Sequence, residues 1–327
     1  MPQELVIVIA LALFFDFLNG VHDSSNIVAT MISSRAFRPL SALSMTAMAE
    51  FIGPFLFGVA VATTIGDEIA QSSALTLDVI AACLIAAIVW NLITWFLGIP
   101  SSSSHALIGG MIGAVVVGAG MQAVKLEGLV KALIALFASP LIGFVCGFII
   151  MRLIFFLVRS ASPGINEFFK RGQLVTALGM AFSHGTNDAQ KTMGIITLSL
   201  VIGGYLPAFR VPTWVIAASA GAIALGTSLG GWRLIRTLGG KFYKVRPVHS
   251  FSTQLASALV IFTASLFGGP VSTTQVVSSA IIGVGSSERL GKVRWSVAGD
   301  IATAWLITIP ASALMSAGVY WLMQSIR

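Results

Sequence analysis

Residues 97–105 read Leu97-Gly-Ile-Pro-Ser-Ser-Ser-Ser-His105, and residues 267–275 read Phe267-Gly-Gly-Pro-Val-Ser-Thr-Thr-Gln275. Each stretch places Gly and Pro between two apolar runs, and hydroxyl residues follow directly. Gly and Pro interrupt a helix, whereas Ser and Thr are preferred at the N-cap of the next one. Each stretch is therefore predicted to be the turn of a helical hairpin whose second arm begins at the serines or threonines.

A second pair of motifs occurs earlier in each half of the chain. Phe17-Leu-Asn-Gly-Val-His-Asp23 aligns with Phe182-Ser-His-Gly-Thr-Asn-Asp188. Two motifs that recur in the same order at nearly the same separation predict an internal repeat. The predicted organisation is a first transmembrane repeat, a cytoplasmic linker and a second, inverted transmembrane repeat, at 1–160, 161–171 and 172–327. The glycines after Asn19 and His184 weaken a helix at mid-span, so discontinuous helices are predicted there.

The amino-acid composition is typical of a membrane protein and not of a soluble one. Of 327 residues, 56% are hydrophobic and 9% are charged, against about 25% charged in a soluble domain. A transmembrane helix needs about 20 apolar residues, and the chain offers such stretches at 5–30, 40–64, 79–97, 126–158, 173–201, 214–230, 255–267 and 295–323. Cys83 and Cys146 lie within apolar runs and indicate neither a disulfide nor a metal framework. The prediction is an all-α, multi-pass protein of the cytoplasmic membrane.

The charged loops predict the orientation. Basic residues gather in four connections, at Arg35 and Arg38 and within 152–171, 233–246 and 289–294, whereas 66–78 carries acids alone. Under the positive-inside rule the basic connections are cytoplasmic, so they suit a membrane protein and no nucleic-acid partner is predicted. The first helix then enters from outside and its counterpart in the second half enters from inside, although Lys125 and Lys131 fall on the predicted outer side. Inverted repeats of this kind are typical of transporters with a substrate site near the bilayer midplane.

The repeated motifs predict an anion site. Two helix N-termini, at Ser101–Ser104 and Ser272–Thr274, would direct unpaired N–H groups and hydroxyls at the centre; alternatively these hydroxyls only cap their own helices. Asp23 and Asp188 are intramembrane carboxylates, which usually mark ion or proton pathways. A carboxylate repels a bare oxyanion but accepts a hydrogen bond from a protonated one. Phosphate carries O–H groups near neutral pH and sulfate does not, so the combination favours phosphate, and the carboxylates can also hold a co-transported cation.

These motifs resemble those of the inorganic phosphate transporter family, which includes bacterial low-affinity phosphate carriers and eukaryotic sodium–phosphate symporters. The resemblance rests on Asn19–Asn26, Ser183–Lys191, Pro100–His105 and Pro270–Gln275, with smaller matches at Trp90-Asn91, Gly226–Trp232 and Trp305–Pro310. It spans nearly the whole chain. It implies a phosphate site shared by both repeats, cation coupling by proton or sodium without another cofactor, and a homodimer.

The residues predicted for each ligand follow from the motifs and their positions. The predicted phosphate ligands are Asp23, Ser102, Ser103, Ser104, Asp188, Lys191, Ser272, Thr273 and Thr274. The predicted ligands of the coupling cation are Asp23, Asn26, Glu50, Asn91, Asn187 and Asp188. Apart from sodium, no metal is predicted.

The chain departs from the family pattern in three places. His22 stands where many members have Asn, and Gln275 stands where a His is common. Lys191 occupies the position that matches Asn26, one helical turn after Asp188. Its charge can bind phosphate, replace a second cation or neutralise Asp188. Because a fixed cation can replace one sodium, this residue favours proton over sodium coupling, with His22 and His184 as possible relays.

Other functions fit the sequence less well. An intramembrane serine hydrolase could use Ser101–Ser104 and His105, but the Gly-x-Ser-x-Gly motif is absent. A metal site at His184 and Asp188 lacks an evident third ligand, so no enzyme is predicted. A passive anion channel would gain little from paired carboxylates, and a sulfate carrier is the alternative among transporters.

Overall fold

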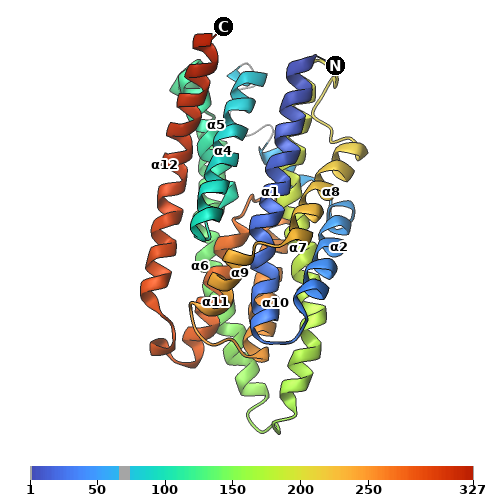
Figure 1. Ribbon diagram of the computed structural model, residues 1–327, viewed down its shortest axis with the longest axis vertical. Helices are drawn as coiled ribbons and strands as arrows, with labels where there is room; N and C mark the ends of the chain where they lie inside the picture. The colour runs from blue at the N-terminus through green and yellow to red at the C-terminus, as the bar shows by residue number, and fades with distance from the viewer. Residues whose placement is uncertain (1, 66–73, 327) are drawn as a thin grey trace.

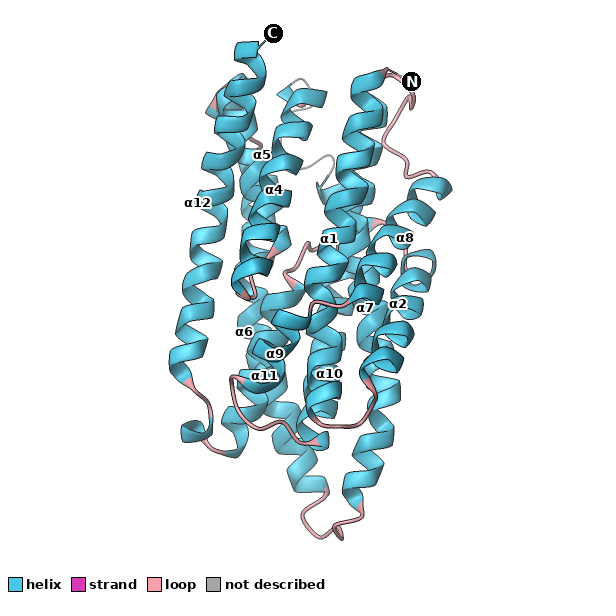
Figure 2. Ribbon diagram, in the orientation of Figure 1, coloured by secondary structure: helices cyan, strands magenta, loops and turns pink. Residues whose placement is uncertain are grey.

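The computed structural model describes residues 2–65 and 74–326, and these residues fold entirely into helices and connecting loops (Figure 2). The predicted all-α class is confirmed. The acidic connection 66–78 lies mostly outside the described residues. The first helix, α1 (Gln3–Ser33), descends from the N-terminus in Figure 1, whereas α7 (Ile165–Ile202) ascends from the lower end. The basic connections that follow α1, α6, α9 and α11 gather at that lower end.

The remaining elements follow the apolar stretches closely. They are α2 (Pro39–Leu56), α3 (Ala60–Thr63), α4 (Leu77–Leu97), α5 (Ser103–Ala119), η3 (Met121–Ala123), α6 (Leu126–Leu157), α8 (Thr213–Leu229), α9 (Trp232–Gly240), α10 (Pro247–Leu266), α11 (Thr273–Glu288), η4 (Leu290–Lys292) and α12 (Trp295–Ile326). Because α7 begins at Ile165, much of the predicted linker 161–171 is helical. The boundaries of the two repeats stay a prediction.

Among the described helices, α1, α4, α6 and α12 are long and apolar enough to cross a membrane, and α8 with α9 could form a further span bent by 72°. The long helix α7 falls outside this group because polar residues such as His184, Asp188 and Lys191 lie on it. These polar side chains are buried against other helices, as membrane proteins require of ionisable groups.

Both predicted hairpins are present. In the first, α4 ends at Gly98 in the left-handed conformation (φ 67°), and Ser102 caps α5 by accepting a hydrogen bond from the His105 N–H at 3.1 Å. In the second, Gly268 has φ 68°, and Ser272 caps α11 by accepting from the Gln275 N–H at 3.4 Å. A residue with a Cβ is disfavoured at such φ values, which explains the glycine at both turns.

The second arm of each hairpin packs on a long helix from the other half of the chain. In α6, Gly143 and Gly147 face the backbone of α11, where added Cβ atoms would lie 2.7 and 2.6 Å from the carbonyl oxygens of Val276 and Ala280. In α5, a Cβ on Gly113 would lie 2.0 Å from the Ala313 carbonyl oxygen of α12. Small residues allow helix backbones to approach closely in membranes. The two predicted halves are therefore interlocked.

The prediction of helix breaks at Asn19-Gly20 and His184-Gly185 is wrong, because α1 and α7 run unbroken through both sites. The glycines serve close helix crossings instead. A Cβ on Gly20 would lie 2.1 Å from the Ile223 carbonyl oxygen of α8, and one on Gly185 would lie 2.4 Å from the Glu50 carbonyl oxygen of α2. Tertiary packing thus outweighs the weak helix propensity of glycine.

The breaks occur in the partner helices. The chain is interrupted between α2 and α3, and between α8 and α9. Gln190 of α7 provides hydrogen-bond partners for the backbone at the first break. Its Oε1 accepts from the Val61 N–H at 2.8 Å, and its Nε2 donates to the Gly58 carbonyl at 2.9 Å. At the second break, the Ser24 hydroxyl of α1 accepts a hydrogen bond from the Gly231 N–H at 2.8 Å. Broken backbone at membrane depth needs such protein partners.

Candidate functional site

Asp23 of α1 and Asp188 of α7 meet at the N-terminus of α11. The Thr273 hydroxyl lies 2.9 Å from an oxygen of Asp188 and 3.4 Å from an oxygen of Asp23. Both aspartates are fully buried. The two motifs that the repeat predicts to be equivalent therefore converge on one hydroxyl group.

The neighbouring residue of α11 completes the contact with α1. Thr274 donates from its hydroxyl to Asp23 Oδ1 at 2.7 Å and accepts from Asn26 Nδ2 at 3.1 Å. Asp23 and Asn26 lie one turn apart on α1, so both face the same helix end. The first turn of α11 also brings unpaired backbone N–H groups and the positive end of the helix dipole to this position.

Lys191 links α7 to the second hairpin. Its ammonium group forms an ion pair with Asp188 and donates to the Val271 carbonyl oxygen at 3.1 Å. Ser104, in the first turn of α5, donates to the same carbonyl at 3.2 Å. The tips of the two hairpins thus meet at the backbone of residue 271, which sequence reasoning could not single out because a carbonyl group carries no residue signal.

A second contact joins the same two tips. Gln275 Nε2 lies 3.4 Å from His105 Nδ1, and that ring nitrogen lies 2.7 Å from the Ser102 hydroxyl. Gln275, which departs from the family pattern, is therefore the partner of the His105 ring across the two hairpins.

His184 connects the aspartates to Glu50. Its Nε2 lies 2.8 Å from Asp188 Oδ2 and 3.8 Å from Asp23 Oδ2, and its Nδ1 lies 2.7 Å from Glu50 Oε1. Glu50 sits where α2 crosses Gly185. An imidazole between carboxylates on both sides can hold or pass a proton.

Asp23, His184 and Asp188 each offer a ligand atom within 4.8 Å of the other two. The sequence supplied His184 and Asp188 at i, i+4 but no third ligand. Asp23 is that third group, and the alignment of the two motifs was the signal that could have paired it with Asp188. This triad is able to hold a cation or share a proton.

Other predicted site residues have different surroundings. Ser102 and Ser272 act as N-caps, as the simpler interpretation of the hydroxyl motifs expected. Asn187 donates to Ser265 Oγ at 2.9 Å and so supports the second hairpin, while its Oδ1 has no hydrogen-bond partner within the described part of the chain. Both amide atoms of Asn91 are likewise buried without a partner among described residues. Ser103 is buried in the first turn of α5.

The cluster is shielded from solvent. Its members are each at most 2% exposed, namely Asp23, Asn26, Glu50, Ser104, His184, Asp188, Lys191, Thr273 and Thr274. Three carboxyl groups and one ammonium group share this interior. Buried charges are tolerated only when they are paired and hydrogen-bonded, which the Lys191–Asp188 pair and the threonine hydroxyls provide.

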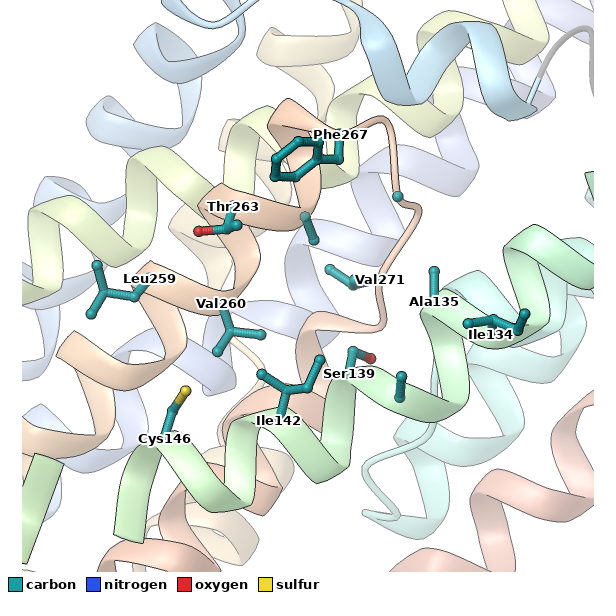
Figure 3. Close-up of a pocket in the computed structure, with 13 residues that line it drawn as sticks. Ile134, Ala135, Ser139, Ile142, Cys146, Leu259, Val260, Thr263, Phe267 and Val271 are labelled. Atoms are coloured by element: carbon teal, nitrogen blue, oxygen red, sulfur yellow. The ribbon is translucent and has the colours of Figure 1, made fainter. Parts of the chain in front are cut away.

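An apolar groove of about 450 Å³ runs beside the cluster, between α6 and α10 (Figure 3). Ile142, Val260 and Phe267 line it, and Val271 of the hairpin turn forms its inner wall. Its only labelled polar side chains in Figure 3 are Ser139 and Thr263. An oxyanion needs several hydrogen-bond donors, so this groove does not suit one, and the candidate anion site is the buried cluster.

Long apolar helices, two hairpins whose tips meet at buried polar groups, and an ionisable cluster in the interior define a multi-pass membrane transporter. The chain belongs to the phosphate transporter family, whose model matches residues 19–316. It is therefore a transporter of the cytoplasmic membrane and not an enzyme.

Similar proteins support this assignment over almost the full length. The chain is 46% identical over 319 residues to a protein of Rhizobium meliloti (strain 1021), covering 97% of this chain and 96% of that protein. It is 44% identical over 325 residues to one of Bacillus subtilis (strain 168), covering 98% and 97%. Both carry the name "Probable low-affinity inorganic phosphate transporter".

A solved structure has the same fold. The protein titled "The sodium-dependent phosphate transporter" superposes with a TM-score of 0.89 at 25% identity, covering 99% of this chain and all of that chain. The predicted resemblance to the phosphate transporter family is thus confirmed.

Proposed function

We propose that the protein carries inorganic phosphate into the cell together with a proton, by alternating access. The observation that carries the proposal is the meeting of Asp23 and Asp188 at the Thr273 hydroxyl. This arrangement joins a helix N-terminus, hydroxyl donors and an ammonium group to carboxylates that accept hydrogen bonds. The names of the relatives support phosphate as the substrate.

Phosphate would bind by replacing internal partners of the cluster. The hydroxyls of Thr273 and Thr274, the Lys191 ammonium and the first-turn N–H groups of α11 can donate to P–O oxygens. A carboxylate of Asp23 or Asp188 can accept from the P–O–H group, which sulfate lacks. Ser103 and Ser104 add the tip of the first hairpin. Charge-assisted bonds of this kind are about twice as strong as neutral ones.

The proposed access mechanism follows from burial. Since every member of the cluster is at most 2% exposed, phosphate can reach it only if the hairpin tips separate. The contacts between Ser104 and Val271 and between Gln275 and His105 are the ones that would open. In this interpretation the structure is an occluded form between an outward-open and an inward-open state.

Proton coupling is proposed because both carboxylate oxygens of Asp188 are already engaged. Asp188 is paired with Lys191, His184 and Thr273, so a fixed ammonium group occupies the place of one cation. The His184 ring between Glu50 and the aspartates offers a route for the proton. Asn26 remains the proposed ligand for any second cation on the α1 side.

Sodium coupling is the second candidate. The structural neighbour with a TM-score of 0.89 is titled sodium-dependent, and the amide groups of Asn91 and Asn187 leave buried oxygens without partners in the described ranges. Oxygen atoms are the ligands that such hard cations prefer.

Uptake of labelled phosphate into liposomes separates these candidates. We expect a proton gradient to drive accumulation in the absence of sodium, and excess sulfate to leave it unchanged. Accumulation that follows only a sodium gradient would transfer the coupling to sodium. Downhill flux that ignores both gradients would indicate a channel, and competition by sulfate as strong as by phosphate would exclude the proposed substrate site.

Substitutions test the residues. We expect Asp23→Asn and Asp188→Asn each to abolish uptake while the purified protein keeps its thermal unfolding transition. Asp300→Asn is the matched control, because Asp300 is an exposed acid on α12 away from the cluster. Normal uptake by both site variants would show that transport does not use this cluster. The homodimer stays a prediction, which mass measurement in detergent can test.

A further inference from the structure

A cavity of about 610 Å³ lies among the basic connections, which gather at the lower end of the molecule in Figure 1. Three separate segments line it: the connection after α1, the connection between α9 and α10, and the residue before α12. They contribute Arg35, Lys244, Arg246 and Arg294, with Ser34 at the wall. Ligand pockets are typically about 300–1,000 Å³, so the cavity has the size of a binding site.

Among the described residues, three of the four basic groups have no acidic partner. Arg246 pairs with Glu288, which also binds Lys292. Within residues 2–65 and 74–326, Arg35, Lys244 and Arg294 form no ion pair, and no acidic side chain lines the cavity. Like charges that converge on one cavity repel one another unless an anion enters. These basic loop residues thus converge on one cavity and are not spread evenly over the surface.

A residue type that is enriched at the headgroup level of membranes lies beside the cavity. Trp295, beside Arg294 at the start of α12, is 50% exposed, and its indole N–H donates to the Leu290 carbonyl at 3.0 Å. Exposed tryptophans mark the membrane–water interface. Basic pockets between transmembrane helices on the cytoplasmic side suit the headgroups of anionic lipids.

The lining connects parts of the transport machinery. Ser34 and Arg35 directly follow α1, the helix of Asp23, and Arg246 is the N-cap of α10, the first arm of the second hairpin. Ser34 further donates to Gln173 of α7 at 3.0 Å. A ligand in this cavity would contact the ends of α1 and α10 together.

We propose that this cavity binds a phosphate group, carried by an anionic phospholipid or as free inorganic phosphate, at a site separate from the transport cluster. Arg35, Lys244 and Arg294 supply the charge-assisted donors, and Arg246 is held at the rim by Glu288. Occupancy joins the cytoplasmic ends of α1 and α10. The lining of this cavity includes none of the residues proposed to bind the transported phosphate or the coupling ion.

The test compares two triple variants with the same change in net charge. The cavity variant is Arg35→Gln, Lys244→Gln and Arg294→Gln. The control variant is Arg152→Gln, Arg159→Gln and Arg171→Gln, which removes three exposed basic groups near the same end of the molecule but outside the cavity. Thermal unfolding of both variants establishes that they fold.

In the lipid arm, the full-length proteins are placed in nanodiscs of phosphatidylcholine with a minor fraction of phosphatidylglycerol, and native mass spectrometry counts the retained phosphatidylglycerol. Each basic group near a membrane surface contributes about fivefold in affinity for anionic lipid. We expect the cavity variant to lose on the order of a hundredfold in affinity for phosphatidylglycerol, and the control variant to retain wild-type affinity.

In the phosphate arm, equilibrium dialysis with labelled inorganic phosphate uses nanodiscs of phosphatidylcholine alone. Loss of one bound phosphate per chain in the cavity variant, with lipid retention unchanged, would identify free phosphate as the ligand. Loss of phosphatidylglycerol with phosphate binding unchanged would identify the lipid. If the cavity variant matches the control in both arms, the proposed site does not exist.

Discussion

The crossing of α2 and α7 offers a sharp test of how packing positions the cluster. Gly185 faces the backbone of α2, and a Cβ there would lie 2.4 Å from the carbonyl oxygen and 2.7 Å from the Cα of Glu50. Backbone atoms cannot move aside like the end of a flexible side chain. Gly185→Ala must therefore push the two helices apart at the point where Glu50 and His184 meet.

The magnitude follows from the distances. Ordinary contact begins at 3.4 Å, so α2 would retreat by about 1 Å. Overpacking costs about 1–3 kcal/mol, and alanine returns about 0.5–1 kcal/mol through its better helix propensity, which leaves a net loss of up to about 2.5 kcal/mol. The shift also lengthens the 2.7 Å separation of His184 Nδ1 and Glu50 Oε1 and so weakens the electrostatic contact between them. Because a misplacement of about 1 Å can cost a hundredfold in rate, we expect uptake to fall roughly tenfold to a hundredfold.

The control lies on the same helix. A Cβ on Gly179 would meet nothing within 4 Å, so Gly179→Ala should retain uptake and stabilise the protein by about 0.4–1 kcal/mol. Thermal unfolding in detergent and initial uptake rates in liposomes measure both variants. If Gly185→Ala unfolds at the same temperature as Gly179→Ala and transports like wild type, the close crossing does not position Glu50.

Three further predictions concern single contacts. Thr273→Val should lower uptake at least about tenfold, because hydrogen bonds to charged groups contribute about 1.5–3 kcal/mol, and Thr273→Ser should restore it; equal uptake by both variants would remove the hydroxyl from the mechanism. Ser272→Ala should destabilise by about 1 kcal/mol through loss of the N-cap, seen in thermal unfolding, and an unchanged transition would contradict the capping role. Gln190→Ala should destabilise by about 1–3 kcal/mol because the Val61 N–H loses its partner, and Gln190→Glu should not restore the stability, because a carboxylate cannot donate to the Gly58 carbonyl; an unchanged unfolding transition in both variants would contradict these contacts.

The hairpins could be predicted because their determinants are local. Gly98 and Gly268 supply positive φ values, and Ser102 and Ser272 bond to N–H groups three residues ahead. Such interactions depend only on neighbouring residues. At Gly20 and Gly185 the low helix propensity of glycine led to a wrong prediction of helix breaks. At these positions the absence of a Cβ allows close contact with another helix.

Many residues of the site could be predicted from the sequence, but the contacts between them could not. The repeat indicated that Asp23 and Asp188 are equivalent, and the hydroxyl motifs named Thr273 and Thr274. No local pattern indicated that His184 would lie between Glu50 and both aspartates, since these residues come from α1, α2 and α7. The role of the Val271 carbonyl, to which both Ser104 and Lys191 donate, could not be predicted either, because every residue has a backbone carbonyl.

The sequence by itself determined that the protein lies in a lipid bilayer, where its helices and hairpin turns are, and which kinds of side chain form the site. Hydropathy, helix capping and turn chemistry are properties of short segments, so they can be recognised without the fold. The tertiary structure alone decided how α5 packs on α12, how α11 packs on α6 and which buried groups touch. Those contacts depend on helix crossings at Gly113, Gly143 and Gly185, where the neighbouring backbone is so close that a Cβ atom would clash with it. Complementarity between distant segments is a property of the assembled fold, because each surface exists only after its helix has formed.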